Sequence, residues 1–248
     1  MQRDGTARLD EFVGESPAAK SLLRQARNAA KSDSLVLITG EKGTGKEMIA
    51  RVIHRMGKRH TQGFINLDCS DVGPAKLQAA LFRHDRSRIE AANQGTLLLE
   101  HIENVSPELR SRLLRMFAQS ESESLRSTTV AQIDLRLIAT MSDIGRGIED
   151  SWLRTGLSPE FKVMSIRVPA LRERRSDIPL LAWHFVRKWA RWMDKSIEVI
   201  SPDTMKSLLN YSWPNNIREL DNVIERSVRS TEGSELRFGS LPENQKRA

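Results

Sequence analysis

The chain has 248 residues, of which 39% are apolar and 29% are charged, a balance typical of a globular protein. No stretch approaches the roughly 18 apolar residues that a membrane span needs, so no membrane partner is expected. Residues 1–10 lack the apolar centre of a signal peptide. A single cysteine, Cys69, excludes an internal disulfide framework and favours a cytoplasmic location. The net charge of +7 suits binding to nucleic acid or nucleotide phosphates, and equally a charged solvated surface.

Apolar runs alternate with helical patterns up to residue 168. Residues 1–11 form a predicted tail. Ser16 and Pro17 then predict a helix start, because serine caps helices and proline suits the first turn. Strands are predicted at residues 35–39, 64–67, 96–99, 134–140 and 163–168. Helices are predicted at residues 47–56, 77–82 and 106–116. This alternation predicts a parallel sheet with helices on both faces.

The pattern changes after Pro169. Helical patterns follow at residues 180–192, 202–211 and 217–229, without a strand signal of comparable strength. We therefore predict an α/β subdomain at residues 12–175, an all-helical subdomain at residues 176–242 and a tail at residues 243–248. Trp183, Trp189 and Trp192 are interpreted as helix-packing residues, and their basic neighbours leave a nucleic-acid surface as the alternative.

A glycine-rich loop separates the first predicted strand from the helix that follows it. Its sequence is Gly40-Glu41-Lys42-Gly43-Thr44-Gly45-Lys46-Glu47. Backbone N–H groups of such a loop wrap around phosphates. In this chain the residues expected to do so are Gly40, Gly43, Thr44 and Gly45. Lys46 would reach the β- and γ-phosphates beside a helix N-terminus. The general motif ends in Ser or Thr, whose hydroxyl binds Mg²⁺, whereas this chain has Glu47.

Four further stretches accompany this loop. They are Phe64-Ile65-Asn66-Leu67-Asp68-Cys69, Gly95-Thr96-Leu97-Leu98-Leu99, the segment from Val168 to Leu181, and Trp213-Pro214-Asn215-Asn216-Ile217-Arg218-Glu219-Leu220-Asp221-Asn222. From Phe12 to about Pro242 the chain resembles the central AAA+ domain of bacterial enhancer-binding proteins, the activators of sigma-54 RNA polymerase. This family normally carries a glutamate at the position of Glu47.

The resemblance implies a ring-forming ATPase with an α/β core and a helical lid, with ATP bound between subunits and Mg²⁺ as a second cofactor. It places Glu47 and Glu100 at Mg²⁺ and makes Arg218, in the lid, a nucleotide-sensing arginine. Arg154 matches the first of two arginines that a neighbouring subunit supplies to the γ-phosphate. The implied partners are further copies of the chain in a ring or dimer, or a related AAA+ subunit. RNA polymerase or DNA would be reached through a flanking or partner domain.

The chain departs from the family at its catalytic positions. Family members carry Asp and Glu after the third strand, where this chain has Glu100 and His101. A neutral histidine can orient water, but its reach and charge differ from those of glutamate. Glu103 is acidic and near, yet it is expected in the wrong register. Met141-Ser142 replaces a polar Thr-Asn sensor, and Glu160 stands where the second arginine is expected. Both changes remove stabilisation of the transition state, so slow or absent hydrolysis is predicted.

The loop that grips sigma-54 is also missing. Family members insert a loop with a Gly-Ala-Phe-Thr-Gly-Ala signature after a Leu-Phe-Gly-His stretch. Here Leu81-Phe82-Arg83-His84-Asp85-Arg86 runs almost directly into Ser87-Arg88-Ile89-Glu90-Ala91-Ala92. The polar segment at residues 120–129 contains no aromatic residue that could replace it. No helix-turn-helix follows the lid, so DNA binding is expected from a partner or a flanking segment.

Three functional hypotheses follow. The leading one is a transcriptional-regulator AAA+ domain that binds ATP or another nucleotide, hydrolyses it poorly, and changes its assembly or exposed surface on binding. The first alternative is an active ATPase of the same family that uses His101. The second is an interaction domain whose pocket senses a signalling nucleotide such as cyclic di-GMP through Arg51, Arg55 and Arg59.

Overall fold

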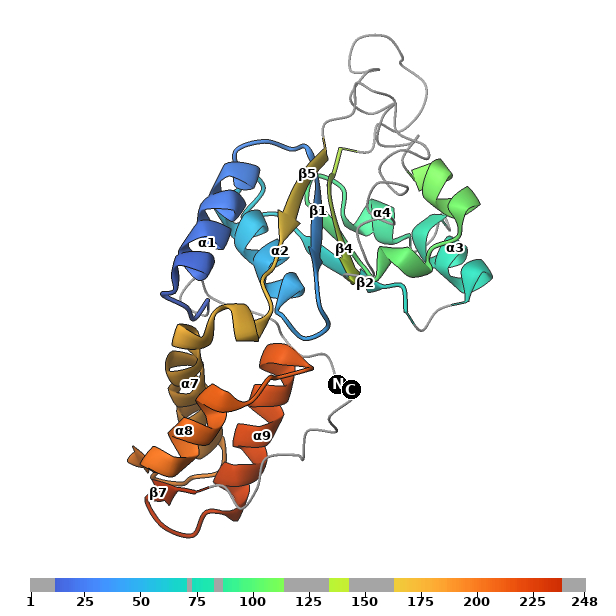
Figure 1. Ribbon diagram of the computed structural model, residues 1–248. Helices are drawn as coiled ribbons and strands as arrows, with labels where there is room; N and C mark the ends of the chain where they lie inside the picture. Colours follow the sequence, from blue (N-terminus) through green and yellow to red (C-terminus); the bar gives the residue numbers. More distant parts are fainter. Residues whose placement is uncertain (1–11, 71–72, 83–86, 114–133, 143–162, 238–248) are drawn as a thin grey trace, which may run out of the picture. The chain divides into compact units, whose positions relative to one another are not determined.

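The computed structural model describes residues 12–70, 73–82, 87–113, 134–142 and 163–237 (Figure 1). These residues form two compact units. The first contains residues 22–40 and the described part of 46–168, and the second contains residues 12–21, 41–45 and 169–237. The units divide after Val168, whereas the subdomain boundary at residue 175 stays a prediction.

The first unit is built on a parallel sheet of five strands in the order β2-β3-β4-β1-β5. The strands are β1 (Leu35–Gly40), β2 (Phe64–Asp68), β3 (Thr96–Glu100), β4 (Arg136–Ser142) and β5 (Val163–Arg167). All five predicted strands are confirmed, with small differences at their ends. Every residue of β1 is buried, as expected for an inner strand of a sheet with both faces covered.

Helices lie on both faces of this sheet (Figure 1). One face is covered by α2 (Lys46–Met56). The other is covered by α3 (Pro74–Phe82), the one-turn α4 (Arg88–Ala91) and a helical segment at residues 107–113. Along the chain, α1 (Pro17–Ala30) comes first and starts where the sequence predicts, because the Ser16 hydroxyl accepts a hydrogen bond from the Ala19 N–H at 3.0 Å.

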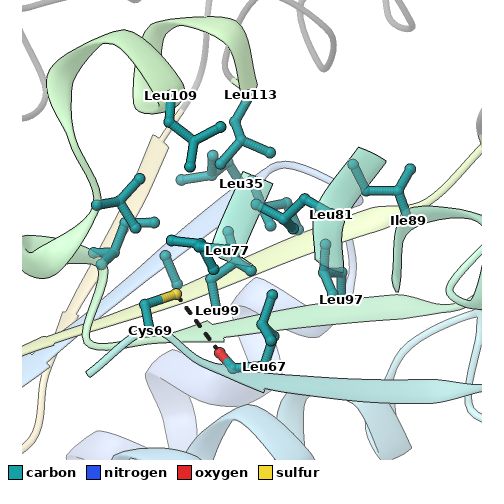
Figure 2. Close-up of a cluster of buried hydrophobic side chains, with 14 of the residues drawn as sticks. Leu35, Leu67, Cys69, Leu77, Leu81, Ile89, Leu97, Leu99, Leu109 and Leu113 are labelled. Carbon is teal, nitrogen blue, oxygen red and sulfur yellow. Dashed lines mark hydrogen bonds between the residues drawn. The ribbon is translucent and has the colours of Figure 1, made fainter. Parts of the chain in front are cut away.

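The core on the α3 side of the sheet is shown in Figure 2. Side chains from β2, β3, α3 and the helical segment at residues 107–113 form much of it, among them Leu67, Leu77, Leu81, Leu97, Leu99, Leu109 and Leu113, and β1, β4 and α4 add others. A spacing of four residues puts both leucines of each helix on one face. Cys69 is buried among them, with its thiol directed at the Leu67 carbonyl oxygen 3.8 Å away. Burial raises the pKa of the Cys69 thiol to about 12, so this cysteine is an unreactive packing residue.

The second unit is mainly helical. It contains two 3₁₀ turns (Leu171–Glu173 and Arg175–Asp177) followed by α7 (Ile178–Trp192), α8 (Pro202–Asn210) and α9 (Asn216–Ser230). The three predicted helices are confirmed. The sequence does not predict the short parallel pairing of β6 (Val199–Ile200) with β7 (Glu235–Leu236), so this unit is not entirely helical.

The tryptophans of α7 divide between packing and exposure. Trp183 and Trp189 pack against the core of the second unit, as predicted. Trp192 is 73% exposed, so its interpretation as a core-packing residue is wrong: it is the last residue of α7 and meets the ring of Trp189 edge-on, with ring centroids 6.0 Å apart. Within the described ranges, no helix has the length and apolar character required to cross a bilayer.

Candidate nucleotide-binding site

The glycine-rich loop connects the end of β1 at Gly40 to the start of α2 at Lys46. Gly43 and Gly45 have φ angles of 79° and 97°, in the left-handed region that favours glycine. Alternation of such residues with ordinary ones brings successive N–H groups together into an anion-binding concavity. A Cβ atom on Gly43 would lie 2.1 Å from the Asn215 carbonyl oxygen, so no larger residue fits there.

Lys46 is the first residue of α2, and its side chain turns back along the loop. Its ammonium group donates a hydrogen bond to the Gly40 carbonyl oxygen at 2.7 Å, and the residue is buried. The next residue, Glu47, accepts two hydrogen bonds from Arg51, at 2.8 and 3.0 Å, one turn further along the helix. The helix N-terminus therefore carries a positioned ammonium and a positioned carboxylate, both beside its partial positive charge.

The carbonyl groups of the loop accept hydrogen bonds from residues of the second unit, to which residues 41–45 belong. The Lys42 oxygen accepts from the Asn216 side-chain amide at 3.0 Å. The Gly43 oxygen accepts from the Arg218 backbone N–H at 3.3 Å. The Thr44 oxygen accepts from the Arg174 guanidinium at 3.0 Å. Arg218 thus lies directly beside the loop.

Sequence reasoning did not single out Glu41, Arg172, Arg174 or Asn216 as loop contacts. The signal was present, because these residues lie inside the loop and the two long motifs on which the resemblance depends. What those motifs could not reveal is which of their side chains meet, since the partners are far apart in sequence.

The end of β3 carries Glu100, whose carboxylate accepts a hydrogen bond from the Asn66 side-chain amide at 2.7 Å. Burial raises the pKa of Glu100. The hydrogen bond from Asn66 opposes this shift, and the negative charges of Glu47 and Asp68 add to it. A cation at this end of the sheet would relieve that repulsion.

These groups fit a Mg²⁺ ion. The Asn66 Oδ1 and Glu103 Oε2 atoms are buried and have no hydrogen-bond partner among the described residues. Over the same residues, no three His, Cys, Asp or Glu side chains are grouped to hold a metal by themselves. Mg²⁺ at nucleotide sites is commonly held by one or two carboxylates together with phosphates and water. Glu100 and Glu47 are the carboxylates that would serve it.

His101 follows Glu100 with a left-handed backbone, φ 56° and ψ 47°. A 3₁₀ turn, Ile102–Asn104, comes next and turns the chain back. This brings Glu103 back beside His101: its Oε1 lies 3.4 Å from His101 Nδ1 and accepts the Ser142 N–H at 3.1 Å. The pair connects the end of β3 to the end of β4. That Glu103 cannot take the place of the water-orienting glutamate stays a prediction from the sequence.

Of the remaining predicted positions, the structure describes some and not others. Met141, near the end of β4, is buried and offers only a thioether. Arg154 and Glu160 lie outside the described residues, as does the polar segment at residues 120–129. Two arginines of the cyclic di-GMP alternative are already engaged. Arg51 pairs with Glu47 and stacks over Phe64, and Arg59 pairs with Asp134 and Asp33.

Comparison with known proteins identifies the family. Residues 12–167 match the sigma-54 interaction domain, and residues 172–248 match the AAA+ ATPase lid domain. The chain is 40% identical over 245 residues to the formate hydrogenlyase transcriptional activator FhlA of Escherichia coli (strain K12), covering 94% of this chain and 35% of FhlA. It is 39% identical over 240 residues to the DNA-binding transcriptional activator HyfR of the same organism (92% and 36%). It is also 36% identical over 249 residues to the transcriptional regulatory protein ZraR of that strain (96% and 56%).

Solved structures agree with this assignment. NtrX from Brucella abortus, crystallised in complex with ATP, matches with a TM-score of 0.76 and 28% identity, over 92% of this chain and 55% of NtrX. The NtrX complex with ADP matches with the same TM-score and 29% identity, over 91% and 54%. The chain thus spans 35% to 56% of the length of these relatives. The predicted fold class, an α/β AAA+ core with a C-terminal lid, is confirmed, and the chain belongs to the sigma-54 interaction domain family.

Proposed function

We propose that this chain is the ATP-binding AAA+ domain of a bacterial transcriptional regulator, and that it hydrolyses ATP slowly. Binding rather than turnover would control its assembly into a ring or dimer, or with a related AAA+ subunit. RNA polymerase or DNA would be reached through a flanking or partner domain in the cytoplasm. The named relatives are transcriptional activators and regulators, which supports this setting.

The geometry of the phosphate loop carries the proposal. Left-handed Gly43 and Gly45, the first turn of α2 and the Lys46 ammonium provide the donors and the positive charge that a polyphosphate needs. Arg218 beside Gly43 would sense the nucleotide from the lid. The ATP and ADP complexes of NtrX support a nucleotide as the ligand.

Mg²⁺ would be held by Glu100 and Glu47 and would neutralise phosphate charge when bound. The residues around it support slow hydrolysis. His101 stands where the family carries a water-orienting glutamate, and its imidazole is turned toward Glu103. Met141 has no group that could hydrogen-bond a phosphate or a water molecule well. Arg154 would reach the γ-phosphate of a neighbouring subunit alone, because Glu160 stands where the family has the second arginine.

The proposed regulator would not remodel sigma-54 polymerase itself. Its sequence lacks the aromatic loop between Arg86 and Ser87. It would therefore act through a sigma-70-type polymerase, by repression, or by modulating a partner that retains the loop.

A titration with a fluorescent ATP analogue tests nucleotide binding. Lys46→Ala removes a charge-assisted contact worth about 1.5–3 kcal/mol, so affinity should fall by about ten- to a hundred-fold. Lys42→Ala is the matched control, because it removes the same charge from an exposed side chain of the same loop. Equal affinities for the wild type and Lys46→Ala would contradict the proposal.

A parallel titration with cyclic di-GMP tests the second candidate. That candidate has less support, because Arg51 and Arg59 already pair with carboxylates. Tighter binding of cyclic di-GMP than of ATP would favour it. The third possibility, an active ATPase, is decided by turnover.

A further inference from the structure

Glu41 directly follows Gly40 in the phosphate loop, and Arg172 and Asn216 hold its carboxylate from two sides. Arg172 donates to both carboxylate oxygens in a two-pronged pair, one bond measuring 2.8 Å. The Asn216 side-chain amide donates to Glu41 Oε2 at 3.1 Å. Two-pronged arginine–carboxylate pairs fix orientation as well as distance, so the Glu41 side chain has a defined direction.

Asn216 connects this pair to the loop backbone. It is fully buried, and its amide nitrogen donates both to Glu41 and to the Lys42 carbonyl oxygen. Its side-chain oxygen accepts the Leu171 N–H at 2.8 Å, which joins it to the segment that carries Arg172. Asn216 itself has φ 54°, a left-handed conformation that asparagine tolerates better than most residues.

The direction of these bonds matters for an anion. In a trans peptide the C=O of one residue and the N–H of the next point in opposite directions. The carbonyls of Lys42, Gly43 and Thr44 all accept donors from the second unit. The N–H groups of Gly43 and Gly45 therefore face the other way, toward the side on which a phosphate would bind, whereas the Thr44 N–H donates to the Glu41 carbonyl oxygen at 3.4 Å.

We propose that Glu41 is a positioning residue for the nucleotide: bound by Arg172 and Asn216, it holds the loop with the Gly43 and Gly45 N–H groups facing the phosphates. This inference rests on the proposed nucleotide binding. It gives Glu41 a role that its charge alone would not suggest, because a carboxylate near phosphates is repulsive.

The two possible roles of the Glu41 charge predict opposite changes in ATP affinity when the charge is removed. If Glu41 acts only as a nearby negative charge, then Glu41→Gln should tighten ATP binding. If it positions the loop, Glu41→Gln should weaken ATP binding by roughly five- to thirty-fold. The variant's loop would have to become ordered when ATP binds, and the entropy lost in that ordering lowers the affinity. Glu232→Gln is the matched control, since it removes an equal charge from an exposed residue of the same unit and should leave affinity unchanged.

Arg172→Lys provides a second variant that keeps the charge and loses the two-pronged geometry. The side chain of Arg172 is 41% exposed, so this change should not prevent folding. It should weaken the binding of the fluorescent ATP analogue in the same direction as Glu41→Gln. The double variant should bind about as weakly as the weaker single variant, because both changes break one interaction.

Amide hydrogen exchange at residues 42–45, measured without nucleotide, separates this inference from the proposed function. Glu41→Gln and Arg172→Lys should speed exchange there, and Glu232→Gln should not. Unchanged or tighter ATP binding by both loop variants, or unchanged exchange, would overturn the inference. A wild type that binds no ATP analogue would remove the proposed function, and the exchange rates alone would then decide whether Glu41 holds the loop.

Discussion

The carboxylate of Asp177 accepts hydrogen bonds from both the backbone N–H and the hydroxyl of Ser16, at 2.8 and 2.7 Å. It also accepts the Glu15 N–H at 2.8 Å, and it is fully buried. The Ser16 hydroxyl in turn caps α1 by accepting the Ala19 N–H. One carboxylate thus fixes the entry of the chain into its first helix against the 3₁₀ turn that precedes α7.

Asp177→Ala should lower the free energy of unfolding by about 3 kcal/mol, because it leaves buried donors without their charged acceptor. It also removes a negative charge that favours the charged form of the buried Arg174. Urea denaturation followed by circular dichroism measures the change. Asp203→Ala, at an exposed position in the first turn of α8, should cost less than about 1 kcal/mol. Equal losses in the two variants would contradict this role.

Stability should also fall as the pH drops below neutral, because of His54. Burial is the main cause that lowers its pKa from 6.5 to about 4, and nearby Arg136 adds to the effect. Above pH 6.5 the imidazole is neutral in both the folded and the unfolded chain. As the pH falls from 6.5 to 4, the unfolded chain takes up a proton that the folded chain resists, so stability is lost over this window. The full loss is about 3 kcal/mol.

His54→Gln should flatten the dependence of unfolding free energy on pH between 6.5 and 4, measured by urea denaturation at several pH values. His184→Gln, a partly exposed histidine of α7, is the control and should leave the slope in place. The same slope in His54→Gln as in the wild type would show that another group causes the loss.

Turnover should be slow, and it should be partly restorable. His101→Glu with Glu160→Arg returns the family's residues to two positions and should raise phosphate release, provided that the subunits assemble. The position of Glu103 adds a condition, because a new glutamate at residue 101 would face the Glu103 carboxylate. Adding Glu103→Gln should therefore raise turnover further. No increase in either combination would contradict the assigned cause of slow hydrolysis.

Open-complex formation should not occur on a sigma-54 promoter. The assay uses purified sigma-54 polymerase, ATP and this chain fused to its DNA-binding partner. Without the aromatic loop, the contact would bury too little apolar surface to support mechanical coupling. Nucleotide-dependent opening would require a gripping surface that the sequence does not contain, and would overturn this part of the account.

The strands were predictable because buried parallel strands appear as short apolar runs, such as Leu35 to Ile38, bounded by turn residues. The β6–β7 pairing was not, since two residues per strand leave no periodic pattern. Trp192 was misassigned because helical spacing alone does not show how far the last turn extends beyond the core.

Within the candidate site, the loop could be recognised locally, from residue types at fixed spacing, and Arg218 was assigned from the motif that carries the family resemblance. The bonds of Glu41 to Arg172 and Asn216 could not, because these partners are 131 and 175 residues away in the chain. The position of Glu103 depends on the left-handed backbone of His101. This conformation is uncommon for residues other than glycine, so it could not be predicted from the sequence.

Analysis of the nucleotide that remains bound tests the central claim most directly. Protein in excess is mixed with radiolabelled ATP and Mg²⁺, and the bound fraction is separated over time and resolved into ATP and ADP. The account predicts that ATP is retained and stays largely uncleaved for far longer than the roughly one second or less that a working enzyme takes for one turnover. Absence of bound nucleotide, or its conversion to ADP at about 1 per second or faster, would contradict it.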